Sequence, residues 1–134
     1  MDGFVSRGIL QASQAKSRPW PTISDEDASL ELRARAWLDI NCASCHQPDG
    51  PGNAAIDLRA ATPLNKTGMI DVVPAQGDLG IRDARIIAPG KPSKSTLWLR
   101  VCKREPGFMP PLATEVVDTA GSSLLKEWIR SIPR

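Results

Sequence analysis

The sequence contains no tyrosine, and its other aromatic residues are few, with four tryptophans and two phenylalanines among 134 residues. It has only one histidine and three cysteines. No apolar run approaches the roughly 18 residues that a membrane-spanning helix needs, which excludes such a helix. The formal net charge is only +2, too balanced for a general nucleic-acid binder. A domain built from this chain is therefore short of large side chains for its core.

Glycine and proline, in contrast, are plentiful, with ten and twelve residues, so much of the chain is expected to be loop. The content of 41% hydrophobic and 24% charged residues is that of an ordinary globular domain. We divide the chain into an N-terminal extension or linker, residues 1–23, and one domain, residues 24–134. A loop-rich domain with few aromatics needs another group at its centre, which the cysteines and the histidine could attach.

Positive charge is concentrated in residues 82–105, which carry seven basic and two acidic side chains. Such a basic segment is either a solvated face of the domain or a docking surface for an acidic partner. In the second case, association should slow as the ionic strength rises.

We expect three helices, each beginning after a residue that caps helix N-termini well. The first begins after Ser24, with acidic residues in its first turn, and runs to about residue 41. The second is short, begins after Ser93 and ends near Cys102. The third begins after Asp118 and is stopped by a proline near the end of the sequence.

Apolar residues recur at helical spacing in the first and third of these segments and give each of them one apolar face. In the first, this face comprises Leu30, Ala34, Trp37 and Leu38, whereas Glu31, Arg35 and Asp39 lie opposite. In the third, it comprises Gly121, Leu124, Leu125, Trp128, Ile129 and Ile132. Residues 47–92 hold many turn signals and are expected to be irregular, apart from a short extended piece at 85–88. Irregular connections of this length in a compact domain usually carry a function or enclose a bound group.

Cys42, Cys45 and His46 form a C-x-x-C-H pentapeptide at the end of the first predicted helix. Two thiols three positions apart can each form a thioether with one vinyl group of a porphyrin. The histidine beside the second thiol is then carried under the iron as its proximal ligand. The spacing therefore predicts one haem c, bound covalently through Cys42 and Cys45 and ligated by His46.

Three other readings of the pentapeptide remain open. A structural zinc site needs four ligands, usually in two separated pairs, and adjacent Cys45 and His46 rarely share one metal. A thioredoxin-like dithiol is expected in a β-α-β context, which the pattern does not show. The two cysteines can also be an ordinary buried pair that matches the motif by chance.

An electron-carrying haem needs a sixth ligand, and methionine is one that raises the reduction potential. Met109 is followed by two prolines that stiffen the loop holding its thioether, and we predict it as this ligand. Met69 is the second candidate for the sixth ligand. The alternative for Met109 is the usual structural role of a methionine, which is to fill a gap in the core. A haem enzyme or gas sensor would instead keep an open sixth position with a polar distal residue, and there is no second histidine for that role.

Residues 42–46 and 109–111 resemble the haem-binding arrangement of class I c-type cytochromes. More closely, four stretches resemble small monohaem cytochrome c domains fused to secreted bacterial proteins, some linked to sugar dehydrogenases or to polysaccharide breakdown. These stretches are RARAWLDINC at 33–42, GDLGI at 77–81, IAPG at 87–90 and MPPL at 109–112. The resemblance spans residues 4–132. The long segment after His46 and the additional Cys102 depart from the pattern.

The resemblance implies an all-α cytochrome c fold, with three or more helices and long loops wrapped around one covalently bound haem. The first and last helices would cross beside the haem, and Gly121 would permit their close approach. Cys42 and Cys45 become attachment sites, and His46 and Met109 become the axial ligands of the iron. The function implied is single-electron transfer, so the chain is expected to be an electron carrier rather than an enzyme.

The resemblance also implies a partner and a location. The partner is a redox protein or a fused oxidoreductase domain, such as a sugar dehydrogenase or a polysaccharide-active copper monooxygenase; no nucleic acid and no membrane span are expected. Covalent haem attachment implies export to the periplasm or outside the cell. The first residues lack the features of a secretory signal, so we expect a domain excised from a larger exported protein.

Four further residues are candidates for contacts with the haem or its ligands. A haem-ligating histidine usually donates its other ring N–H to a carbonyl, and the segment around Pro51 resembles the one that serves there. Trp98, Arg85 and Arg59 are candidate donors to the haem propionates, although each can equally be a packing or surface residue. Cys102 is expected to be a small buried hydrophobe, with an intermolecular disulfide or a reactive thiol as the alternative.

Overall fold

The computed structural model describes residues 20–111 and 115–134. Over these residues the chain is a small, mainly helical domain with three α-helices and long loops, and without a sheet. The elements in chain order are α2 (Leu30–Cys42), the 3-10 turns η2 (Leu64–Lys66) and η3 (Pro92–Lys94), α3 (Thr96–Val101) and α4 (Thr119–Ser131). This confirms the predicted helical class. Most of the extension predicted at 1–23 lies outside the described residues.

Helix α2 begins later than predicted, because Ser29 rather than Ser24 is its N-cap. The Ser29 hydroxyl accepts a hydrogen bond from the backbone N–H of Leu32, at 3.1 Å. The Asp25 carboxylate instead accepts from the N–H of Asp27, two residues along the chain, at 3.2 Å. Such a local bond stabilises a turn in competition with a helix. The acidic residues expected in the first helical turn therefore precede the helix.

Helix α3 ends at Val101 with Cys102 as its C-cap, as predicted, but Ser93 is not its N-cap. Ser93 lies inside the 3-10 turn η3, and Ser95 precedes the helix. The Ser95 side chain is fully buried, where its hydroxyl accepts from Ala88 N–H at 2.9 Å and contacts Lys91 O at 2.9 Å. Its contacts to the preceding loop fix where the helix starts.

Helix α4 confirms both predicted features of the last helix. Asp118 is its N-cap and accepts a hydrogen bond from Gly121 N–H at 2.8 Å. The predicted apolar face is buried, except for Ile132, which packs partly buried against the core. The core also takes apolar residues from α2, from the long loop and from α3, namely Ala34, Leu38, Ala43, Leu58, Met69, Ile87 and Val101.

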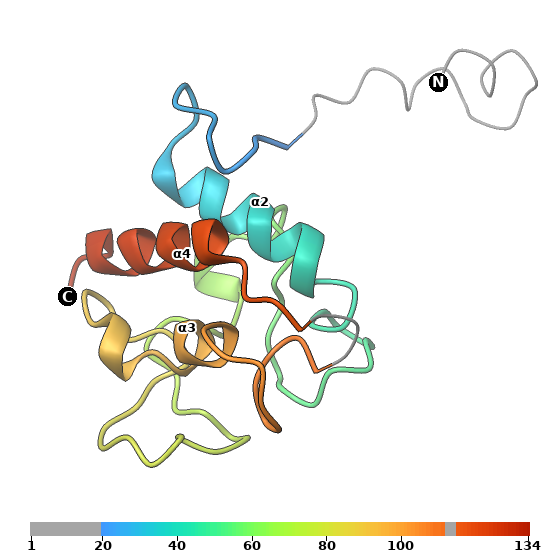
Figure 1. Cartoon of the computed structure of the whole chain (residues 1–134), viewed down its shortest axis with the longest axis vertical. Helices are drawn as coiled ribbons and strands as arrows, with labels where there is room; N and C mark the ends of the chain where they lie inside the picture. The colour runs from blue at the N-terminus through green and yellow to red at the C-terminus, as the bar shows by residue number, and fades with distance from the viewer. Residues whose placement is uncertain (1–19, 112–114) are drawn as a thin grey trace, which may run out of the picture.

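Helices α2 and α4 cross in contact with each other, as Figure 1 shows for the cyan and red helices. At the crossing, the Trp37 indole lies where a side chain on Gly121 would have to fit, since a Cβ there would overlap the ring. The Trp37 Nε1–H also donates to Asp118 Oδ2 at 2.8 Å. The expected role of Gly121 in a close approach of the two helices is thus confirmed.

The long connection between α2 and α3 is mostly irregular, as predicted. Its regular elements are the two 3-10 turns and two isolated parallel bridges, Ile70 with Ile87 and Arg85 with Ser95. The bridges confirm a short extended piece around residues 85–87. In Figure 1 this connection, coloured green to yellow, passes beneath the helices and closes the lower side of the domain.

Candidate functional site

The pentapeptide lies where α2 ends, and its backbone turns tightly. Cys42 is the last residue of the helix, and its carbonyl accepts from the N–H groups of Cys45 and His46, at 3.1 and 2.9 Å. Cys42 is half-buried and Cys45 is exposed, and neither thiol is in a disulfide. Burial, with a smaller contribution from Cys45, raises the pKa of Cys42 to about 12, so this thiol is protonated at neutral pH. One turn thus presents two free thiols and an imidazole.

The imidazole of His46 has a buried nitrogen, Nδ1, that has no hydrogen-bond partner. Burial lowers the pKa of His46, so the ring is neutral at pH 7. Neutral imidazole is the form that binds metals.

The segment 50–52 lies directly against the pentapeptide. Gly52 N–H donates to Cys45 O at 2.9 Å. A Cβ on Gly52 would lie 2.7 Å from both Cys45 O and His46 Nδ1, and one on Gly50 would lie 2.5 Å from Cys45 O. Only glycine fits at either position without displacing the backbone. The segment around Pro51 therefore reaches the imidazole as expected, but no hydrogen bond joins Nδ1 to it. The carbonyl acceptor at Pro51 stays a prediction.

Met109 lies in an irregular segment, residues 105–111, which we call the Met109 loop. Its side chain is half-buried and packs against the core. Met69, the second candidate ligand, is only 1% exposed and is a member of the core cluster. This burial fits a methionine that fills the core. Met109 as an axial ligand stays a prediction.

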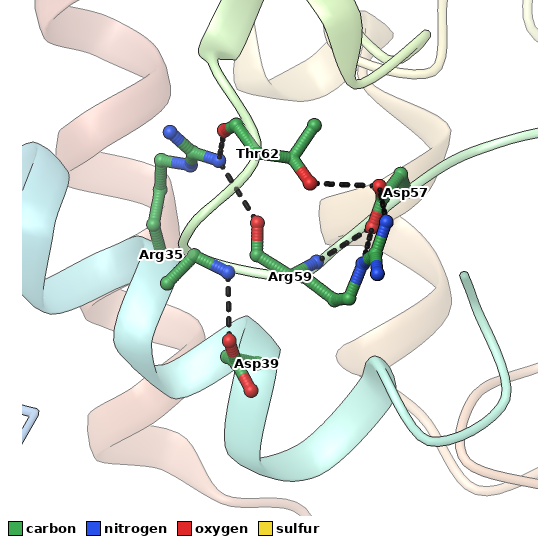
Figure 2. A network of polar contacts seen from close by, with 6 residues as sticks. Arg35, Asp39, Asp57, Arg59 and Thr62 are labelled. Atoms are coloured by element: carbon green, nitrogen blue, oxygen red, sulfur yellow. Dashed lines mark hydrogen bonds and ion pairs between the residues drawn. The ribbon is translucent and has the colours of Figure 1, made fainter. Parts of the chain in front are cut away.

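A polar network joins residues 57–62 to α2 (Figure 2). Arg35 is buried, with a relative exposure of 8%, and its guanidinium donates to the carbonyls of Arg59 and Thr62. Asp39, one turn further along α2, accepts from Ala60 N–H at 2.7 Å. The loop thus covers Arg35 and binds Asp39 on the helix face opposite the apolar residues.

Asp57 completes this network. Its carboxylate accepts from the Arg59 guanidinium at 2.7 and 2.9 Å and from the Thr62 hydroxyl at 2.7 Å. These hydrogen bonds, that of Arg59 above all, hold the pKa of Asp57 well below its ordinary value. The next residue, Leu58, donates its N–H to His46 O at 2.9 Å. The network therefore fixes the backbone of the proposed ligand.

Sequence reasoning missed this network as part of the site. The available signal was an acidic and a basic residue two positions apart, Asp57 and Arg59, and such pairs are also common on solvated surfaces. The partners of Arg35 lie 24 and 27 residues away in sequence, so no local pattern reveals them.

Besides Arg59, which binds Asp57, two further predicted haem-contacting residues already have partners within the chain. Trp98 donates its Nε1–H to Ser122 O at 2.9 Å, and Lys126 Nζ lies 5.1 Å from the centre of its ring. Arg85 pairs with Asp71 at 3.3 Å and donates to a backbone carbonyl. Both therefore have structural roles in the fold, and their contacts to a propionate stay predictions.

Cys102 is half-buried and not in a disulfide. Burial raises the pKa of its thiol, although Lys126 and Arg104 act in the opposite direction. A protonated, partly enclosed thiol fits the expected small hydrophobe better than a reactive group.

Among the described residues, no group of three or more His, Cys, Asp or Glu side chains is placed to hold a metal ion. The zinc interpretation of the pentapeptide therefore gains no support. None of the described helices is long and apolar enough to cross a membrane. Comparisons with protein families, curated proteins and solved structures gave no match. The functional interpretation accordingly depends on the residues of this chain alone.

Proposed function

We propose that this chain is a monohaem c-type cytochrome domain that carries single electrons. The observation that carries the proposal is the end of α2, where two free thiols and a neutral imidazole lie within one turn. This is the residue set that covalent attachment and proximal ligation of one haem require.

The residues present fit such a group. Buried polar atoms are nearly always hydrogen-bonded, so the unpaired Nδ1 of His46 is an exception that needs a reason. A ligating histidine uses one nitrogen for the metal and the other for an orienting hydrogen bond. With Nε2 left for the iron, Nδ1 would be oriented by the backbone of residues 50–52, which already lies against it.

Each residue then has a distinct task. Cys42 and Cys45 hold the porphyrin covalently, and His46 supplies a nitrogen ligand whose backbone is fixed by Leu58. Met109 supplies a thioether, which favours the reduced iron and raises the reduction potential. When bound, the haem supplies reversible one-electron chemistry between ferric and ferrous iron.

The proposal extends to the setting of the domain. Because the chain passes electrons and converts no substrate, it needs a redox partner protein or a fused oxidoreductase domain. A sugar dehydrogenase and a polysaccharide-active copper monooxygenase are the two partner classes that the sequence resemblance suggests. Covalent haem attachment implies a periplasmic or extracellular site of action.

The decisive experiment is production of the chain in a bacterial host that matures c-type cytochromes. We expect a pyridine haemochrome spectrum and an intact mass increased by one haem. Cys42→Ala with Cys45→Ala should abolish the increase, whereas Cys102→Ser, the matched control, should retain it. A colourless protein of unmodified mass would refute the proposal, and a high-spin ferric spectrum would favour a haem enzyme or sensor with an open sixth position.

A further inference from the structure

The Met109 loop is irregular, yet several hydrogen bonds join it to the end of α3. Met109 N–H donates to Arg100 O at 2.8 Å, and Phe108 N–H donates to Glu105 O within the loop at 3.0 Å. Lys103 Nζ lies 5.6 Å from the centre of the Phe108 ring. The position of the methionine thus depends on the last turn of a short helix.

Arg104 binds this loop through its guanidinium. Its Nη1 donates to the carbonyls of Val101, Lys103 and Met109, at 3.1, 2.8 and 3.0 Å. The Nε of the same side chain is buried without a partner, so part of the group is enclosed. One cation therefore binds the last carbonyl of α3, the carbonyl of Lys103 just after it and the carbonyl of Met109 itself.

Arg100 also binds the loop. Its Nη1 donates to Gly107 O, two residues before the methionine. Its Nη2 donates to Gln76 O and Gly77 O, at 2.8 and 3.1 Å, in the long connection. The guanidinium thus joins the Met109 loop to a segment about 30 residues earlier in the chain.

We propose that Arg100 and Arg104 are positioning residues that clamp the Met109 loop and thereby hold its thioether on the iron; this inference rests on the proposed function. An external ligand can bind the sixth position only in molecules whose loop has moved away. Its apparent affinity is therefore reduced by the small fraction of open molecules. Loss of a charged hydrogen bond to the loop raises that fraction.

The test is binding of imidazole to the ferric holoprotein, followed by its absorption spectrum. We expect Arg104→Gln and Arg100→Gln each to bind imidazole about tenfold more tightly than the wild type. Arg82→Gln is the matched control, because Arg82 is exposed, belongs to the same basic segment and loses the same charge. Its imidazole affinity should stay at the wild-type value.

A second measurement separates clamping from general stability. Amide hydrogen exchange at Phe108 and Met109 should accelerate in the Arg104 variant more than exchange in α4. If Arg104→Gln does not fold, Arg104→Lys keeps the charge but loses the planar fork, and it should show an intermediate imidazole affinity.

Two outcomes would overturn the clamp. One is an imidazole affinity that stays at the wild-type value in both arginine variants. The other is an affinity that increases equally in these two variants and in Arg82→Gln. Failure of the proposed function looks different, because the wild type would then carry no covalent haem or would show no spectral band that depends on Met109.

Discussion

At the scale of single residues, the surroundings of a side chain decide what the side chain can do. His46 is neutral because burial lowers its pKa, and its enclosed Nδ1 has no hydrogen-bond partner. Met109 and Met69 have the same chemistry, but one is half-buried at the edge of the core and the other is enclosed within it. This difference in burial separates the proposed ligand from the core methionine.

The prediction at this scale concerns the variant Met109→Ala. We expect covalent haem to be retained, and the weak charge-transfer band near the red end of the ferric spectrum to disappear. The reduction potential should fall by about 0.1 V or more, within the range that axial ligands control. Absorption spectroscopy and a redox titration measure both changes. Met69→Leu, which nearly conserves the core volume, should keep the band, and loss of the band in this variant alone would move the ligand to Met69.

At the scale of elements, the crossing of α2 and α4 depends on three residues from both helices. The Trp37 indole occupies the space over Gly121 and donates to Asp118, which also caps α4. A larger side chain at Gly121 would have to displace the indole. The same contacts therefore join the helix that carries Cys42 to the helix that closes the core.

The pH dependence of stability tests this crossing. Backbone hydrogen bonding from Gly121, followed by the bond from Trp37, lowers the pKa of Asp118. A lowered folded-state pKa gives stability that is present above the unfolded value of about 4 and is lost as the pH falls through the folded-state pKa. We expect Asp118→Asn to cost about 0.5 kcal/mol at pH 7, after allowance for exposure, and progressively less at acidic pH.

Chemical unfolding of both proteins between pH 2 and pH 7, a range chosen to bracket carboxylate titration, measures this difference. The exposed Asp27 makes a suitable control, because Asp27→Asn should leave stability nearly unchanged. A constant difference between wild type and Asp118→Asn across the whole range would contradict the linkage.

The elements also show which sequence signals were sufficient. The start of α4 was predicted correctly because Asp118 and the apolar face are both local and agree with each other. The predicted start of α2 was wrong because the Ser24 hydroxyl contacts the Thr22 hydroxyl, whereas Ser29, five residues later, accepts the capping hydrogen bond; residue type alone does not rank two serines. The predicted start of α3 after Ser93 was wrong because hydrogen bonds to the preceding loop fix Ser95 as the residue before the helix.

At the scale of the whole molecule, the basic segment of residues 82–105 is largely used by the fold. Five of its seven cations contact groups within the chain, namely Arg85, Lys94, Arg100, Lys103 and Arg104. Arg82 and Lys91 are exposed. Fewer cations are accordingly free to contact an acidic partner than the seven that the sequence shows, and the docking surface stays a prediction beside the solvated face.

Electron transfer to an acidic redox partner should therefore slow as salt increases, but with a shallow dependence. Rates measured by stopped flow over a range of ionic strength test this expectation. The double variant Arg82→Gln with Lys91→Gln should flatten the dependence further. A wild-type rate indifferent to salt would remove the docking surface from the account.

The sequence by itself determined the chemistry that neighbouring residues make: the thiol–thiol–imidazole turn, the cap and apolar face of α4, and the irregular course of the long connection. Each of these depends on groups only a few positions apart. The tertiary structure decided the rest, because its contacts join residues distant in the chain. Only folding brings Arg35 to the carbonyls of Arg59 and Thr62, and Arg100 to both Gly107 and Gly77. Spacing in a sequence carries no information about which distant carbonyl a long cationic side chain will reach.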